Sequence, residues 1–113
     1  MTSMTDGARR AYRHEMAAAK AATGGDDRWR HLERAHIVSQ PDPWLHTCNH
    51  AAMLALALRQ RDRGEALGQA LRILVAAPGS MTGRYPEGNT GRVSAGLKTP
   101  MRTPTDLAVA LAE

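Results

Sequence analysis

Three histidines and one glutamate in the middle of the chain have the spacing of a metal-binding set. His46 and His50 are four residues apart, which places two imidazoles side by side on one helical face and suits chelation of a metal. Glu33 and His36 are three apart, as in the Glu-x-x-His element that holds metals in helical bundles. Imidazole and carboxylate together suit zinc, iron or copper. The four residues are therefore candidate ligands of a transition-metal ion.

Two helices must position these residues. The segments on either side of Pro41-Asp42-Pro43 both have helical periodicity, and a turn this short makes them antiparallel neighbours. With about 1.5 Å of rise per residue, His36 lies about 6 Å from the turn and His46 about 4 Å, whereas Glu33 and His50 each lie about 10 Å away. We therefore expect all four side chains in one layer between the two helices.

Several interpretations of this set stay open. A metal ion with an open coordination position would act as a catalytic centre, whereas a closed site would serve binding, sensing or structure. Without metal, the chain would be a non-enzymatic interaction domain with a buried His/Glu hydrogen-bond network, or would use a histidine as an acid or base. Gln40 is expected to cap its helix or to orient a ligand histidine. Cys48 falls opposite the histidines and is excluded from the set.

Composition limits the compartment and the partners. Cys48 is the only cysteine, so neither an intrachain disulfide nor a thiolate cluster forms. The first ten residues do not resemble a signal peptide, and the longest apolar run, 51–58, is too short for a membrane span, so we expect a cytoplasmic protein without a membrane partner. Arginine supplies 13 of the 15 cations, but acids lie between them despite a net charge of +4. This pattern argues against nucleic acid and favours an anionic small molecule or a protein partner.

The length of 113 residues and the apolar fraction of 42%, with no Phe, predict one all-α domain spanning residues 1–113. Four main helices are predicted at about 5–22, 26–40, 43–60 and 62–77, and a short C-terminal helix from about residue 104. Pro78-Gly79 is expected to end the fourth helix. Residues 78–103 then form a long Gly/Pro/Arg-rich loop, which we expect to pack on the helical bundle.

Helical periodicity also assigns the faces of these helices. The fourth helix has a predicted buried stripe of Leu67, Leu71, Leu74 and Val75. Glu65, Gln69 and Arg72 lie opposite, where we expect a solvated face or, alternatively, a face that docks the long C-terminal segment. Trp29, Trp44 and Met53 are expected in the core. A small, Ala-rich core leaves apolar surface to cover, so we also expect a homodimer.

Several segments together resemble a bacterial family of short single-domain helical proteins of unknown function. They are His31–Ile37, Ser39-Gln40-Pro41, His46 with His50, Gly68-Gln69 with Arg72, and Pro86–Gly91. The likeness covers the chain from about Ala11 to Leu111. It implies that residues around Gly88-Asn89-Thr90-Gly91 belong to the domain and are ordered against the helices, and it brings no activity. From the residues alone, this segment is either a glycine turn or a loop whose amides and guanidinium groups hold an anion.

Overall fold

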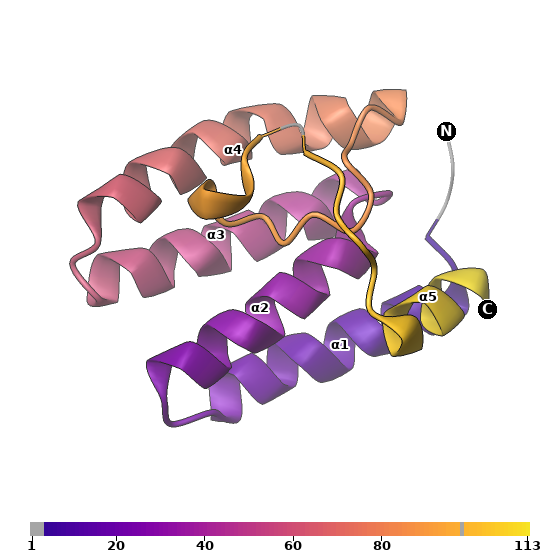
Figure 1. Ribbon diagram of the computed structural model, residues 1–113, viewed down its shortest axis with the longest axis horizontal. Helices are drawn as coiled ribbons and strands as arrows, with labels where there is room; N and C mark the ends of the chain where they lie inside the picture. The colour runs from indigo at the N-terminus through magenta and orange to yellow at the C-terminus, as the bar shows by residue number, and fades with distance from the viewer. Residues whose placement is uncertain (1–3, 98) are drawn as a thin grey trace.

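The computed structural model describes residues 4–97 and 99–113, which contain five α-helices, one short 3-10 helix and no strand (Figure 1). The predicted all-α fold is confirmed for this part of the chain. The elements are α1 Asp6–Ala21, α2 Gly25–Ser39, α3 Pro43–Arg59, α4 Arg63–Thr82, η1 Val93–Ala95 and α5 Thr105–Ala112.

Local sequence sets most of the helix ends. The side chains of Thr5, Asp42 and Asp62 each accept a hydrogen bond from the backbone N–H three residues later, and so cap α1, α3 and α4. Pro43 occupies the first turn of α3, where its missing N–H costs nothing. Gly83, with a φ of 71°, ends α4 in the left-handed conformation that favours glycine. The turn between α2 and α3 is therefore as short as the sequence predicts.

The predicted end of the fourth helix is wrong, because α4 continues through Pro78 to Thr82. A proline inside a helix removes one backbone hydrogen bond, here to the carbonyl of the exposed Leu74, and the helix can continue if its last turn is held by other contacts. Ser80 supplies such a contact, because its hydroxyl donates to the backbone carbonyl of Gln40. The last turn of α4 is thereby tied to the end of α2.

The helices form two antiparallel hairpins, α1 with α2 and α3 with α4, and α2 packs against α3 (Figure 1). The short α5 packs on α1 near the N-terminal end of the chain. One hydrophobic cluster joins α1, α2 and α5, and consists of Met4, Ala8, Tyr12, Ala35, Ile37, Val38 and Leu107. A second joins all four long helices, α1, α2, α3 and α4, and consists of Ala19, Trp29, Leu32, Met53, Leu56, Ala57 and Ala66. The predicted core positions Trp29 and Met53 are confirmed.

The predicted orientation of the fourth helix is wrong, because α4 turns its polar face inward. The predicted buried stripe lies in solvent, with Leu67 76% and Leu74 74% exposed and the other two members, Leu71 and Val75, exposed as well. The three polar residues opposite, Glu65, Gln69 and Arg72, are all buried. Glu65 and Gln69 find several hydrogen-bond partners inside the molecule, which removes the usual cost of burying them.

Trp44 is also misplaced by the sequence prediction, since 72% of it is exposed. It lies in the first turn of α3, and His46 follows two residues later, about 200° further around the helix. A helix that turns His46 into the interior must therefore turn Trp44 outward.

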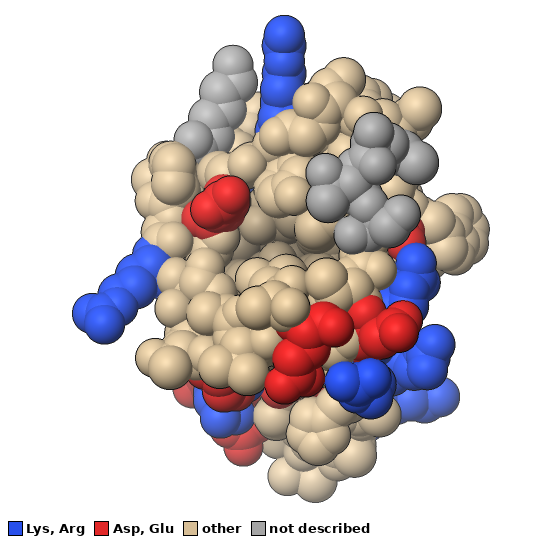
Figure 2. Space-filling model, turned by 90° about the vertical axis from the view of Figure 1, so that its right-hand side faces the viewer, with Lys and Arg blue, Asp and Glu red and all other residues tan. Residues whose placement is uncertain are grey.

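The outer surface carries charges of both signs. Figure 2 shows one face on which Lys and Arg side chains and Asp and Glu side chains lie around a largely uncharged centre. None of the helices in the described ranges has the length and apolar character that a membrane crossing requires.

Candidate metal centre

Three histidines from two helices meet in the interior. His36 comes from α2, and His46 and His50 come from α3. Their Nε2 atoms form a small triangle, 3.1 Å from His36 to His46, 3.1 Å from His36 to His50 and 3.2 Å from His46 to His50. All three residues are at least 94% buried. The structure therefore brings together the three histidines that helical spacing places in one layer.

Each of the three rings is held from its other nitrogen. The Nδ1 atom of His36 lies 2.7 Å from the backbone oxygen of Asn89. That of His46 lies 2.8 Å from the Ser80 hydroxyl, and that of His50 lies 2.7 Å from the Gln69 side-chain oxygen. A buried histidine hydrogen-bond network therefore exists, and it lies on the outside of the triangle.

This network fixes which nitrogen of each ring carries the proton. The Asn89 carbonyl can only accept, so His36 Nδ1 must donate to it. The Ser80 hydroxyl already donates to the Gln40 carbonyl, so it accepts from His46. The Gln69 amide nitrogen donates to the Glu65 carboxylate and to the Gly91 carbonyl, which leaves its oxygen to accept from His50. All three imidazoles therefore carry their proton on Nδ1.

Burial keeps the three rings neutral. It lowers the pKa of His46 to about 3, with a further contribution from His50, and lowers the pKa of His50 to about 4. Burial and the two neighbouring rings hold the pKa of His36 well below its ordinary value. A neutral imidazole has one N–H, and here it is already used at Nδ1. The three Nε2 atoms are therefore unprotonated.

The three unprotonated Nε2 atoms cannot hydrogen-bond to one another, because none of them carries a proton. Their lone pairs face one another at 3.1–3.2 Å, which is repulsive unless a cation lies among them. In a tetrahedral zinc site with Zn–N bonds of about 2.0–2.1 Å, neighbouring nitrogens lie about 3.3–3.4 Å apart. A shift of a few tenths of an ångström in each ring would give that geometry. The triangle can therefore hold a metal through three imidazoles and leave a fourth position open.

The structure does not bring the fourth predicted ligand, Glu33, into this group. Among the described residues, the potential metal-binding group that contains the histidines has only His36, His46 and His50 as members. The Glu33 carboxylate instead lies 3.4 Å from the Arg92 guanidinium, which also stacks on the Trp29 ring with its central carbon 3.7 Å from the ring centre. Burial raises the pKa of Glu33, although Arg92 opposes this effect.

The two other histidines and Cys48 lie outside the triangle. Cys48 is half-buried on α3 outside the triangle, as its helical position predicts. His14 is exposed, and His31 is bonded at 2.7 Å to the carboxylate of Glu15. Gln40, which was predicted to cap its helix or to orient a ligand histidine, is almost fully buried and lines the same small hollow as the three histidines.

Sequence reasoning missed the residues that hold the rings, namely Gln69, Ser80 and Asn89. Gln69 lies on α4 on the face that was predicted to be solvated, and Ser80 lies in the last turn of α4, which was predicted to be a loop. Asn89 lies in the segment after α4. The signal that could have found Gln69 is the polar stripe on α4, whose alternative interpretation was docking of the C-terminal segment. Glu65 and Gln69 do bond residues 91–93 of that segment.

A family model described as "Protein of unknown function (DUF3703)" matches residues 6–111. The chain belongs to this family. The DUF3703 match includes all three histidines and every residue that bonds their Nδ1 atoms. No curated protein and no solved structure matches the chain.

Gly91 explains one of the segments that the resemblance to this DUF3703 family rests on. Its φ is +84°, and a Cβ at this position would lie 2.6–2.9 Å from three atoms of the His36 ring. The absence of a side chain lets the backbone pass directly over that ring, and the Gly91 carbonyl then accepts from Gln69. The segment after α4 thus closes one side of the triangle.

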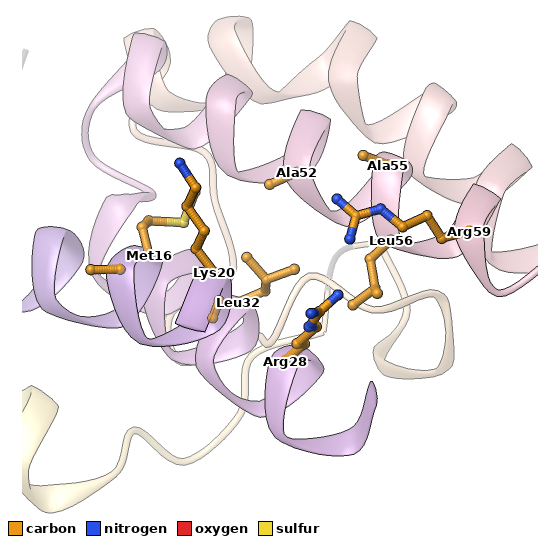
Figure 3. A pocket seen from close by; sticks show the side chains of 10 residues that line it. Met16, Lys20, Arg28, Leu32, Ala52, Ala55, Leu56 and Arg59 are labelled. Atoms are coloured by element: carbon orange, nitrogen blue, oxygen red, sulfur yellow. The ribbon is translucent and has the colours of Figure 1, made fainter. Parts of the chain in front are cut away.

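A larger cavity of about 500 Å³ lies between α1, α2 and α3 (Figure 3). Apolar side chains such as Leu32 and Leu56 line it, and the basic groups of Lys20, Arg28 and Arg59 lie around them. The described residues that line it differ from those that line the histidine site, so the two hollows are separate.

Proposed function

We propose that this protein binds one transition-metal ion through the Nε2 atoms of His36, His46 and His50. The observation that carries the proposal is the Nε2 triangle, with sides of 3.1–3.2 Å, in which every ring has its only proton committed to an acceptor at Nδ1. Metal-bound histidines in proteins almost always donate their second nitrogen to an oxygen in this way. A hydrogen-bond network without metal leaves the three facing lone pairs unsatisfied.

Zinc is the metal that this donor set favours. Three neutral imidazoles with an open fourth position are a ligand set of catalytic zinc, and the near-tetrahedral spacing suits an ion without a preferred geometry of its own. Non-haem iron in its common site also takes a carboxylate. Glu33, the residue that would provide it, is engaged by Arg92. Copper shares the preference for imidazole and is the main competitor.

Elemental analysis of the untagged protein tests this proposal. We expect about one equivalent of metal per chain, mostly zinc, and less than a tenth of that in the His46→Asn and His50→Asn variants. His14→Asn, on an exposed histidine, is the matched control and keeps its metal. Circular dichroism of each variant distinguishes loss of the site from loss of the fold.

The competing function is a metal-free interaction domain. Measurement of the metal content distinguishes it from the metal-binding function. A wild-type protein that stays folded and binds no zinc, copper or iron from equimolar solution would overturn the metal proposal. Equal metal content in wild type and in both site variants would overturn it as well.

A further inference from the structure

A small cavity adjoins the open side of the histidine triangle. It has a volume of about 40 Å³ and is lined by the three histidines together with Gln40, Arg72 and Asn89, among others. One water needs at least about 10–15 Å³ of such volume, so the cavity has room for about two or three atoms of that size. A metal held by the three Nε2 atoms would therefore face a space that protein atoms do not fill.

Gln40 is one of the residues that line this cavity, and it also lines a second hollow beside Thr5 and Tyr85. It is 99% buried, and its side-chain oxygen makes no hydrogen bond to any described residue. Leaving a buried amide oxygen without a donor is costly, so native structures nearly always supply a partner. Among the described residues, Asn49 has the other such oxygen, and Asn49 does not line the cavity. An N–H or O–H group in the cavity would provide the Gln40 oxygen with the donor that it lacks.

Arg72 brings a positive charge without a counter-ion. It is 93% buried, its guanidinium donates to the Gly68 carbonyl at 3.2 Å, and no described carboxylate lies within ion-pair distance. The Glu65 carboxylate is engaged by Gln69, by Arg92 and by the Val93 backbone N–H. A buried charge is normally paired, because removing it from water is costly. The unpaired guanidinium therefore favours a negative group in the same cavity.

We propose that the fourth position of the metal takes an exchangeable small anion, with hydroxide or water as its resting occupant, next to the Arg72 guanidinium and the Gln40 amide oxygen. This inference rests on the metal binding proposed above. Three neutral imidazoles leave the charge of a divalent metal unbalanced, and Arg72 adds one more positive charge beside it. Hydroxide meets both demands, since its charge faces the cations and its O–H donates to Gln40. The ligand class is a small oxyanion or pseudohalide of about three non-hydrogen atoms.

Cobalt substitution tests the inference, with azide as the probe. The Co²⁺ protein in chloride-free buffer is titrated with sodium azide while the visible d–d absorption is recorded. We expect saturable changes in these bands. Arg72→Met should weaken azide binding at least about tenfold, because a nearby buried charge is lost. Gln40→Leu should strengthen it about threefold or more, because azide has no proton to donate and water loses its acceptor.

Two variants control for indirect effects. Arg63→Met removes an exposed arginine from the same helix and should leave azide affinity unchanged. If Arg72→Met fails to fold, Arg72→Lys keeps the charge and should keep azide affinity within about threefold.

The outcomes separate this inference from the proposed function. Cobalt bands that form with one equivalent of Co²⁺ but do not respond to 100 mM azide would overturn the open position and leave metal binding intact. Failure of the bands to form at all would overturn the proposed function itself. Azide binding that is equal in wild type and Arg72→Met would remove Arg72 from the site.

Discussion

At the scale of single residues, Gly91 is the position where the smallest change should disturb the proposed metal site. A methyl group there would meet the His36 ring at 2.6–2.9 Å, which no rotation of the methyl relieves, so the ring must shift. We expect Gly91→Ala to weaken zinc affinity about tenfold to a hundredfold, as changes around metal ligands commonly do. Competition with a chromophoric zinc chelator measures this affinity.

Gly83 provides the matched control for Gly91. Its φ of +71° is similarly left-handed, but a Cβ there would meet nothing within 4 Å. Gly83→Ala should cost about 1–2 kcal/mol of unfolding free energy from backbone strain and leave zinc affinity unchanged. Equal zinc affinity in Gly91→Ala and wild type would show that this contact does not position His36.

The residues that the sequence does and does not predict differ in how far along the chain their partners lie. His36, His46 and His50 follow from helical spacing and a two-proline turn, since these fix both face and depth. Glu33 shares the helix of His36 but is drawn to Arg92, 59 residues later, and no local periodicity carries that information. The same holds for Asn89, whose carbonyl reaches His36 over 53 residues.

At the scale of helices, α4 shows how a site can reverse an amphipathic pattern. Leucines at positions 67, 71 and 74 would normally face the core. The interior here instead needs Gln69 for the His50 ring and Glu65 for the segment at 91–93, so the polar stripe faces inward. Hydrophobic periodicity locates α4 but does not determine its rotation, because the hydrogen-bond partners of Gln69 and Glu65 lie 19 to 28 residues away along the chain.

This reversal predicts unusual effects of substitution on α4. Leu67→Gln combined with Leu74→Gln should change the free energy of unfolding by less than about 0.5 kcal/mol for each substitution, because both side chains are exposed. Gln69→Ala should cost about 1–3 kcal/mol, because it leaves the His50 N–H without its acceptor. Urea denaturation at a protein concentration low enough to keep the chain monomeric measures both. A larger loss in the leucine variant than in Gln69→Ala would mean that α4 has the opposite rotation.

The exposed leucines also give the expected homodimer a location. An isologous contact between two copies of α4 would cover the same stripe on each chain, as apolar patches on monomers often require. The Leu67→Gln, Leu74→Gln double variant should then form less dimer than the wild type at the same protein concentration, as measured by sedimentation velocity. Val109→Gln, on the exposed face of α5, should not change it.

At the scale of the whole molecule, the histidine site lies where the two helical hairpins meet. His36 belongs to the first hairpin, while His46, His50 and the partners Gln69 and Ser80 belong to the second. The segment after α4 adds Asn89, so the site joins three parts of the chain that are separate in sequence. The hydrophobic clusters are small and contain several alanines. A metal bound by the three histidines would add a cross-link between the α1–α2 hairpin and the α3–α4 hairpin.

Metal removal should therefore lower the thermal stability of the entire domain. A ligand that binds only the folded state, at a free concentration of 100 times its Kd, adds about 2.7 kcal/mol of stability. For a domain of about 100 residues, 1 kcal/mol shifts Tm by about 4–8 °C, so we expect apo and zinc-bound protein to differ by about 10 °C or more. Circular dichroism melts after chelator treatment, with and without buffered Zn²⁺, measure this difference. Mg²⁺, which prefers oxygen ligands, should produce no shift, and neither should Zn²⁺ added to His50→Asn. A Zn²⁺-dependent rise of the same size in that variant would place the stabilising metal elsewhere in the chain.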